Sequence, residues 1–246
     1  MRNLVLCSLF LSGTLVASGS YAASITVGGG VAVKDPAYRG FSSETRLLPA
    51  FFIDHRYFRL AGANLDLKVA DHNNVAVVVR ARYALYDGYR SKDAWILDGM
   101  KRDASIWLGP HISWQFTANS QLFAEVLGDT FSNSEGWQAS TGISTRFILT
   151  RRLHLEPRVT ISWYDKNYID YYYGVRTAEA RDYRIAYQGE AAVLPEAAVR
   201  LMYIISPEQA VSLNTGVRFL PDEVYDSPLI DSRTEKNASL FYSYRF

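Results

Sequence analysis

The sequence predicts an all-β protein, an antiparallel transmembrane β-barrel of about twelve strands that follows a cleaved signal peptide. Three observations predict this fold class: an apolar segment at the N-terminus, apolar residues at every second position along the remainder, and the aromatic Phe246 at the end of the last alternating segment. A tilted strand of about nine residues crosses a bilayer. A terminal aromatic strand of this kind is typical of bacterial outer-membrane barrels.

Residues 1–22 have the organisation of a secretory signal peptide. Arg2 gives a positive start, and residues 4–16 form an apolar stretch that is too short to span a membrane as a helix. The sequence Ser-Tyr-Ala at positions 20–22 places small residues where a signal peptidase cleaves. Cleavage after Ala22 is predicted, which leaves residues 23–246 as one outer-membrane β-barrel domain.

The composition favours a membrane protein without a transmembrane helix. Hydrophobic residues make up 48% of the chain and aromatic residues 14%, yet no run of 18 apolar residues follows the N-terminal segment. The 26 basic and 25 acidic residues nearly balance, so no nucleic-acid partner is expected. Cys7 is the only cysteine and lies in the predicted signal peptide. Neither a disulfide framework nor a cysteine metal site is therefore expected.

Alternation recurs in order along the chain, and each alternating segment has a second face that is polar or small. The segments cover residues 25–33, 75–85, 104–116, 137–147, 153–163, 191–205, 211–219 and 238–246. The charged residues of the second face are Arg80, Arg82, Arg146, Arg158, Arg200, Arg218 and Arg245 with Glu125, Asp129, Glu156, Glu190 and Glu196. A charge facing lipid at the bilayer midplane costs about 2–4 kcal/mol. These side chains are therefore predicted to face the lumen, where the first five arginines should meet Glu125, Glu156, Glu190 or Glu196.

A soluble β-sandwich is the alternative fold, because its strands also alternate. Its polar face would look at water and could be densely charged in either sign, whereas a lumen needs balanced charge. Aromatic residues also lie on the apolar face near strand ends, at Phe116, Trp137, Phe147 and Trp163. Such residues are typical of the girdles at membrane interfaces. Together with the signal peptide, these features favour the membrane barrel.

Connection lengths predict the topology. Residues 117–120, 150–152 and 206–208 are short turns, and residues 34–45, 87–102, 165–187 and 221–235 are long polar loops. Barrels place short turns in the periplasm and long loops outside. Counting back from a periplasmic C-terminus requires residues 46–70 to cross three times. A turn at Gly62-Ala63-Asn64 gives twelve strands, but the flanking segments are short, so ten strands with an irregular piece is the alternative.

Two loop motifs resemble the MltA-interacting protein (MipA/OmpV) family. The motifs are Tyr171-Tyr172-Tyr173-Gly174-Val175, followed by Glu179-Ala180, and Asp226-Ser227-Pro228. Weaker family positions are matched by residues 97–100 with Arg102, and by Gly128-Asp129. The resemblance covers essentially the whole chain. It implies an outer-membrane barrel of a Gram-negative cell envelope, without enzymatic activity or cofactor, that serves as a scaffold for a lytic transglycosylase and a peptidoglycan synthase.

The candidate binding residues are those of the two loop motifs. The aromatic loop could stack on sugar or drug rings, or it could pack down and close the outer mouth. The Asp-Ser-Pro motif is most simply a turn initiator, because Pro228 fixes the backbone. A small-solute channel or binding barrel is thus the alternative function.

A third function, hydrolysis of outer-membrane lipid, depends on one constellation. His111 and Ser113 share a strand face, and Glu125 is expected on the same lumenal face of the next strand. These residues could act as base, nucleophile and orienting acid. A hydrogen-bond network inside a filled barrel is the simpler interpretation, so no catalytic residue is assigned. The four histidines form no metal motif, and the glycines at 28–30 are interpreted as easing curvature or close packing.

Overall fold

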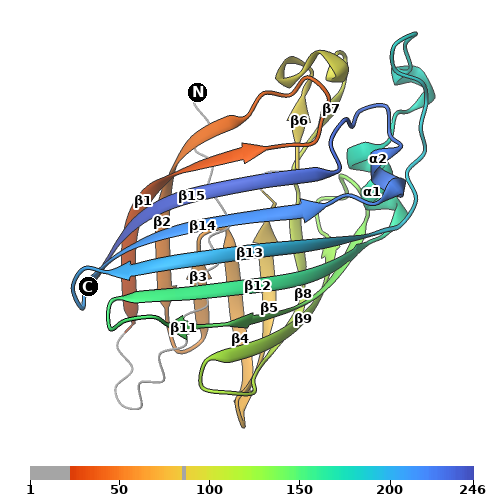
Figure 1. The fold of residues 1–246 in the computed structure, drawn as a ribbon. Helices are drawn as coiled ribbons and strands as arrows, with labels where there is room; N and C mark the ends of the chain where they lie inside the picture. The colour runs from red at the N-terminus through yellow and green to blue at the C-terminus, as the bar shows by residue number, and fades with distance from the viewer. Residues whose placement is uncertain (1–22, 85–86) are drawn as a thin grey trace.

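A computed structural model describes residues 23–84 and 87–246, which form a closed antiparallel β-barrel (Figure 1). The first strand pairs with the last, so the sheet closes on itself. The sheet contains thirteen assigned strands, but β11 continues β10 beyond Arg146 along the same neighbour. The barrel wall therefore consists of twelve strands. The prediction of twelve strands is confirmed, and the alternative of ten is not. The predicted signal peptide lies outside the described residues.

The strands of the barrel sheet are β1 (Ser24–Asp35), β2 (Glu44–Asp54), β3 (Phe58–Ala61), β4 (Asn64–His72), β5 (Val75–Tyr83), β8 (Ile106–Gln115), β9 (Ser120–Asp129), β10 (Trp137–Thr145), β11 (Phe147–Ile148), β12 (Leu153–Tyr164), β13 (Ala192–Ile204), β14 (Gln209–Phe219) and β15 (Thr234–Arg245). A separate ribbon joins β6 (Tyr89–Arg90) to β7 (Lys101–Arg102). The helices are α1 (Lys166–Tyr173) and α2 (Asp222–Tyr225), with short 3-10 turns η1 (Ser91–Asp93), η2 (Trp95–Leu97) and η3 (Thr177–Glu179). None of the described helices is long and apolar enough to cross a membrane.

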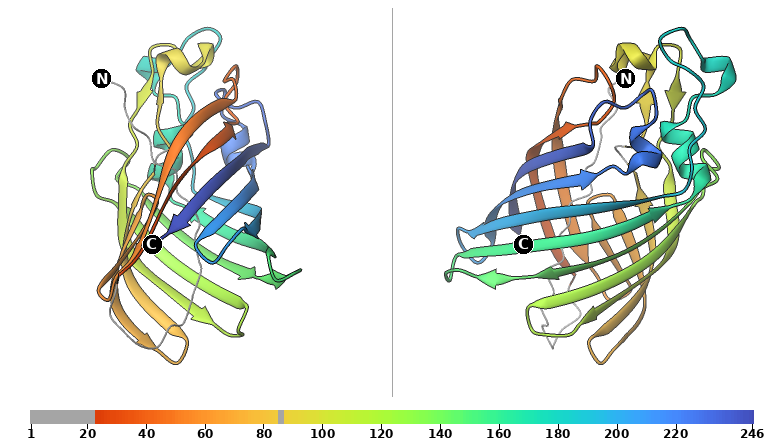
Figure 2. Two further views of the ribbon diagram at one scale, coloured as in Figure 1. Left: turned by 90° about the vertical axis from the view of Figure 1, so that its left-hand side faces the viewer. Right: turned by 45° about the vertical axis from the view of Figure 1, so that its right-hand side comes forward.

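The long loops and the short turns lie at opposite ends of the barrel (Figure 2). Both helices and the β6–β7 ribbon belong to the long-loop end. Outer-membrane barrels keep their long loops outside the cell and their short turns in the periplasm. The loop end is therefore the outer mouth, and the short turns between strands form the periplasmic rim.

Residues 46–70, for which the sequence left two topologies open, contribute three successive strands to the wall, β2, β3 and β4. Gly62 turns the chain with a φ of 58°, a left-handed conformation that glycine adopts without a steric penalty. β3 has only four residues and pairs with the last three residues of β2. Among the described residues, the rest of that β2 edge has no strand partner. Pro49 lies on this edge, where its missing N–H leaves no donor unpaired.

The outer wall carries the apolar face of every long strand. The four predicted girdle residues Phe116, Trp137, Phe147 and Trp163 are 40% to 55% exposed, as side chains that meet the membrane interface should be. A lipid-facing wall also explains why many leucine, isoleucine and valine side chains of the strands remain exposed in the isolated chain.

The polar face lines the lumen, and most of its predicted ion pairs are present. Arg80 and Arg82 contact Glu125 at 2.9 and 2.5 Å. Arg146 and Arg158 contact Glu156 at 3.5 and 3.3 Å, and Arg218 contacts Glu196 at 3.2 Å.

Among the described residues, four members of the predicted lumenal set form no lumenal ion pair. Asp129 accepts from the hydroxyls of Ser105 and Ser134, and Arg245 donates to the carbonyl oxygen of Pro207. Glu190 is an exposed loop residue that pairs with Lys166 at 2.8 Å, so its prediction as a lumenal partner was wrong. The reason is that β13 begins only at Ala192, so Glu190 lies in the loop two residues before the strand. Arg200 faces the lumen, but its Nε donates to the amide oxygen of Asn214 at 2.8 Å instead of to a carboxylate.

Glycines on β1 allow the closing seam to pack tightly. A Cβ at Gly28 or Gly30 would lie 2.1 Å from a carbonyl oxygen of β15, which is far inside van der Waals contact. At Gly29, which points outward, the nearest atom would lie 3.6 Å away. The interpretation of Gly28 and Gly30 as close-packing residues is therefore confirmed.

Candidate functional site: the loop core at the outer mouth

A hydrophobic core, here called the loop core, closes the outer mouth. All four long loops contribute to it, and it packs onto inward residues at the outer ends of the strands. Its buried members are Ala37, Tyr89, Ala94, Ile96, Leu97, Met100, Trp107, Leu127, Tyr164, Tyr168, Ile169, Tyr172, Tyr173, Val175, Ala192, Leu194, Leu220, Val224, Leu229 and Ile230. The four long loops were predicted to be polar, but their apolar residues form a buried core, which the two-residue period of the strands did not reveal.

Helix α1 forms in the longest loop because its ends are well defined. Asp165 caps the helix by accepting a hydrogen bond from the backbone N–H of Tyr168 at 2.9 Å. At the other end, a Cβ at Gly174 would lie 2.2 Å from the carbonyl oxygen of Asp170. The glycine of the Tyr-Tyr-Tyr-Gly-Val motif is thus required by close approach. Inside the helix, Tyr168, Ile169, Tyr172 and Tyr173 turn toward the barrel and are buried.

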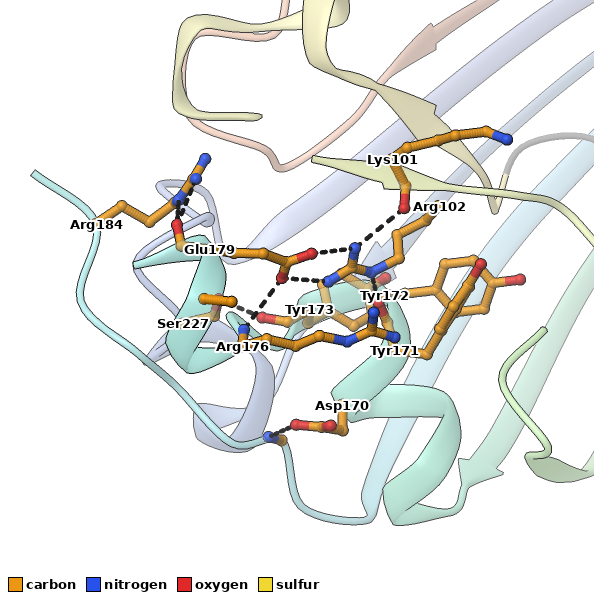
Figure 3. A network of polar contacts seen from close by, with 12 residues as sticks. Lys101, Arg102, Asp170, Tyr171, Tyr172, Tyr173, Arg176, Glu179, Arg184 and Ser227 are labelled. Atoms are coloured by element: carbon orange, nitrogen blue, oxygen red, sulfur yellow. Dashed lines mark hydrogen bonds and ion pairs between the residues drawn. The ribbon is translucent and has the colours of Figure 1, made fainter. Parts of the chain in front are cut away.

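A buried arginine joins the β6–β7 ribbon to the loop that follows α1 (Figure 3). Arg102 is 2% exposed, and its two Nη atoms donate to the two carboxylate oxygens of Glu179 at 2.8 and 2.7 Å. Its Nε donates to the carbonyl oxygen of Tyr171 at 2.5 Å. Bidentate pairs of this kind are among the strongest hydrogen bonds in proteins. Burial alone would raise the pKa of Glu179, but the hydrogen bond from Arg102 and the backbone N–H of Arg176 hold it below its ordinary value.

A second buried arginine forms hydrogen bonds with the same two loops. Arg184 is fully buried, and its guanidinium donates to the carbonyl oxygens of Ile96, Asp98 and Glu179. Its stick in Figure 3 lies beside Glu179, on the segment that leads back toward β13. The sequence carries no signal for this role, since Arg184 lies in a polar stretch among exposed residues. Three backbone carbonyls replace the carboxylate that a buried arginine usually meets.

The two loop motifs contact each other. Ser227 is buried, and its Oγ donates to the carbonyl oxygen of Tyr173 at 2.6 Å. The backbone N–H of Leu229 donates in turn to Ser227 Oγ at 3.2 Å. Tyr38, from the first loop, donates to the carbonyl oxygen of Tyr172 at 3.1 Å. The end of α1 is thus held by two other loops at once.

The predicted binding residues divide by exposure. Tyr172, Tyr173, Gly174, Val175 and Ser227 are buried, Tyr171 and Pro228 are half-buried, and only Asp226 is exposed. The aromatic side chains therefore pack down at the mouth. The sequence indicated their partner Arg102 only as a weaker family position, and it did not indicate their partner Tyr38.

The carboxylate of Asp87 lies at the inner surface of the loop core. Asp87 Oδ2 accepts a hydrogen bond from Tyr168 Oη at 3.0 Å. Burial raises the pKa of Asp87, and Lys34, Arg218 and the Tyr168 hydroxyl oppose that shift without cancelling it. Both Asp87 and Tyr164 also line the lumenal space beneath. The loop core is therefore the outer wall of that space.

Beneath the loop core the lumen contains two adjoining cavities of about 220 Å³ each. The two cavities share lining residues such as Arg82, Arg158 and Glu196, so these side chains lie between them. The second cavity extends to Asp71 near the periplasmic turns. The interior is narrow and crossed by ion pairs, but it is not filled.

The second cavity is lined by His111, Ser113 and Glu125, but these residues do not form a catalytic triad. Glu125 Oε2 lies 3.0 Å from His111 Nδ1, and Arg80 Nη1 lies 3.0 Å from the same nitrogen. The His111 ring also stacks on Phe123. Within the described part of the chain, no hydrogen bond joins Ser113 to His111. Nucleophilic catalysis requires that contact between nucleophile and base.

An apolar outer wall, a charged lumen and a folded loop core define the class of this protein, a transmembrane β-barrel of the outer membrane. Residues 27–246 match the family model described as MltA-interacting protein MipA. The chain belongs to this family, which confirms the resemblance seen in its loop motifs.

Relatives of known name are also outer-membrane proteins. The outer membrane protein YiaT of Escherichia coli (strain K12) is 26% identical over 229 residues, which are 92% of this chain and 92% of the relative. The MltA-interacting protein of the same strain is 23% identical over 245 residues, 97% of this chain and 98% of the relative. The protein is accordingly located in the outer membrane.

Solved structures with a similar fold are outer-membrane barrels. An outer membrane channel from Pseudomonas putida F1 is similar with a TM-score of 0.47 and 14% identity, and covers 94% of this chain and 100% of its own. The NanC porin is similar with a TM-score of 0.41 and 8% identity, and covers 92% and 100%.

Proposed function

We propose that this barrel is a non-enzymatic anchor that holds a lytic transglycosylase, together with a peptidoglycan synthase, at the periplasmic face of the outer membrane. The proposal is supported by the relative named MltA-interacting protein, which matches over nearly the whole chain. The observation that carries it here is the closed outer mouth. A barrel whose loops form a core and whose lumen is crossed by ion pairs is a rigid body with little free passage.

The periplasmic rim offers a defined contact for such a partner. The turn between β11 and β12 carries Arg151 and Arg152, both exposed, and Leu149 beside them is 53% exposed. An exposed apolar side chain with two adjacent positive charges suits an acidic surface with a small apolar centre. Because the rim consists of short turns, the interface is small and the affinity modest.

The test uses the purified barrel in lipid nanodiscs and the purified lytic transglycosylase from the same cell. Surface plasmon resonance should detect saturable binding, and the double variant Arg151→Ser/Arg152→Ser should weaken it. Lys92→Ser removes an exposed charge from the outer loops and serves as the matched control, which should bind like the wild type. Absence of binding by the wild-type barrel would overturn the anchor proposal.

A small-solute channel or binding barrel is the second candidate, and the two lumenal cavities favour it. Ion pairs between lining side chains, such as Arg82 with Glu125 and Arg218 with Glu196, narrow the lumen. In a planar bilayer, the purified protein should therefore give a conductance far below that of a general porin. Large, steady single-channel currents would instead make the channel the primary function.

A further inference from the structure

Three arginines gather around one carboxylate in the lumen. Glu156 accepts from Arg158 at 3.3 Å and pairs with Arg146 at 3.5 Å. Arg200 lies directly opposite Glu156 in the register of β12 and β13. All these side chains face the lumen, so three positive charges lie close to Glu156.

Arg200 is the arginine that lacks a carboxylate. Its Nε donates to Asn214 at 2.8 Å, and Asn214 Nδ2 donates to Ser239 Oγ at 3.3 Å. These bonds hold the guanidinium in place across three neighbouring strands. Within residues 23–84 and 87–246, no carboxylate oxygen lies within 4.0 Å of Arg200, and its two Nη groups have no hydrogen-bond acceptor.

The nearby acids are already engaged by other groups. Glu196 and Glu235 both contact Arg218, at 3.2 and 3.6 Å. Asp87 accepts from Tyr168 in the loop core. Among the described residues, these acids therefore give Arg200 no counter-charge. A guanidinium held away from bulk water without a counter-charge is costly, so this position favours a bound anion.

The cavity of about 220 Å³ supplies the space for that anion. Arg158, Arg200, Asn214, Ser239 and Lys34 all line it. The volume lies below the 300–1,000 Å³ that is usual for drug-sized ligands, so only a small molecule fits. Guanidinium groups bind carboxylates and phosphates in a bidentate manner. The adjoining cavity, which reaches Asp71, gives a route from the periplasmic end.

We propose that the lumen holds a small oxyanion, a carboxylate or a phosphate, between Arg158 and Arg200. The amide of Asn214 and the hydroxyl of Ser239 contribute further polar contacts at its edge. This site lies inside the barrel, whereas the proposed anchor function uses the periplasmic rim, so either can fail without the other.

The experiment titrates the refolded full barrel in detergent, at low ionic strength, by isothermal titration calorimetry. The probes are inorganic phosphate, succinate and the uncharged analogue succinamide. Saturable binding of phosphate or succinate, with none of succinamide, is expected. The oxyanion that binds more tightly identifies the source of the ligand. Absence of saturable binding by both anions would overturn the proposal.

Two variants with opposite expected effects test the position. Arg200→Gln should weaken anion binding about ten- to hundredfold, which is the cost of one lost charge-assisted hydrogen bond. Glu156→Gln removes the competing carboxylate and should tighten binding. Lys92→Gln, in the exposed outer loops, is the charge control and should leave the affinity unchanged.

Folding of each variant is checked by heat-modifiable gel mobility. If Arg200→Gln does not fold, Glu156→Gln decides alone, since weaker or unchanged anion binding there contradicts the proposal. Equal affinity of folded Arg200→Gln and wild type would also overturn it.

Discussion

Arg102 and Glu179 are 77 residues apart in sequence, yet their side chains form two parallel hydrogen bonds of 2.8 and 2.7 Å at the outer mouth. Arg102 is almost fully buried, and Glu179 is largely so. The pair joins the loop between β5 and β8 to the loop between β12 and β13. Both loops also contribute buried residues to the loop core, so the pair and the core depend on each other.

Replacement of Glu179 by alanine should loosen the loop core. Arg102 would remain buried without its counter-charge, and breaking a buried pair in this way costs several kcal/mol. Because Glu179 is partly exposed, a loss of about 2–3 kcal/mol is expected. Hydrogen–deuterium exchange of α1 should therefore accelerate while exchange of the barrel strands stays slow.

The control is Glu190→Gln in the same loop. Its partner Lys166 and Glu190 itself are both well exposed, and such surface pairs contribute about 0–1 kcal/mol. Equal exchange rates of α1 in the Glu179 and Glu190 variants would contradict the role of Arg102–Glu179.

Asp87 should make the stability of the loop core depend on pH. Burial raises its pKa in the folded protein above the unfolded value of about 3.9. The contribution of this group to stability is thus complete below the unfolded pKa, and it is lost as pH rises through the raised folded pKa. Asp87→Asn keeps an acceptor for Tyr168 and removes the ionisation, so the variant should be more stable than wild type at neutral pH.

Thermal unfolding of the loop core, followed by near-ultraviolet circular dichroism, measures this effect. The gain of the variant over wild type should increase as pH rises from about 4 toward the raised pKa of Asp87, and it should then level off. A difference that stays constant over this range would show that Asp87 ionises with an ordinary pKa.

Two adjacent glycines of β1 should respond differently to the same substitution. Gly30→Ala places a Cβ 2.1 Å from the carbonyl oxygen of Leu240 and against the ring of Phe241, so the closing seam must shift. Overpacking of this kind costs about 1–3 kcal/mol. Gly29→Ala points outward, where the nearest atom lies 3.6 Å away, and should be tolerated. Urea unfolding in detergent compares the two, and equal midpoints would exclude a role of the seam.

The fold could be predicted largely because its signal is local and periodic. Alternation along β12 or β15 fixes which side chain faces lipid, and the short turns then fix the strand order. Even the short β3 could be placed, because the topology required a turn near Gly62. That Arg80 and Arg158 pair with lumenal glutamates follows from the same rule, since lumenal charges must be balanced, but the rule did not assign a particular glutamate to each arginine.

The loop core could not be predicted in the same way. Its contacts, such as Ser227 with Tyr173 and Arg184 with the carbonyl of Ile96, join loops that are far apart in sequence and have no common period. Buried arginines in loops look like solvated charges when only the sequence is read. The family motifs identified the segments that form the loop core. Which residues of the other loops they contact could be seen only in the folded structure.

The mature N-terminus remains a sequence prediction, because residues 1–22 lie outside the described part of the chain. Cleavage after Ala22 should give a mature protein that begins at Ala23, one residue before β1. N-terminal sequencing of the protein purified from outer membranes checks the site. A start several residues inside β1 would be incompatible with the pairing of Thr26 with Arg245.

Ser113 should be dispensable if the lumenal network is structural. His111 is held by Glu125 and Arg80, and no described hydrogen bond connects it to Ser113, so the hydroxyl has no activating base. Ser113→Ala should leave the barrel fold and every cellular phenotype unchanged. In contrast, Glu125→Gln should destabilise the barrel by about 3–5 kcal/mol, because Arg80 and Arg82 lose a shared counter-charge. Hydrolysis of phospholipid or lipopolysaccharide by the wild type, abolished in Ser113→Ala, would show instead that Ser113 is a nucleophile, since an activated hydroxyl has no substitute.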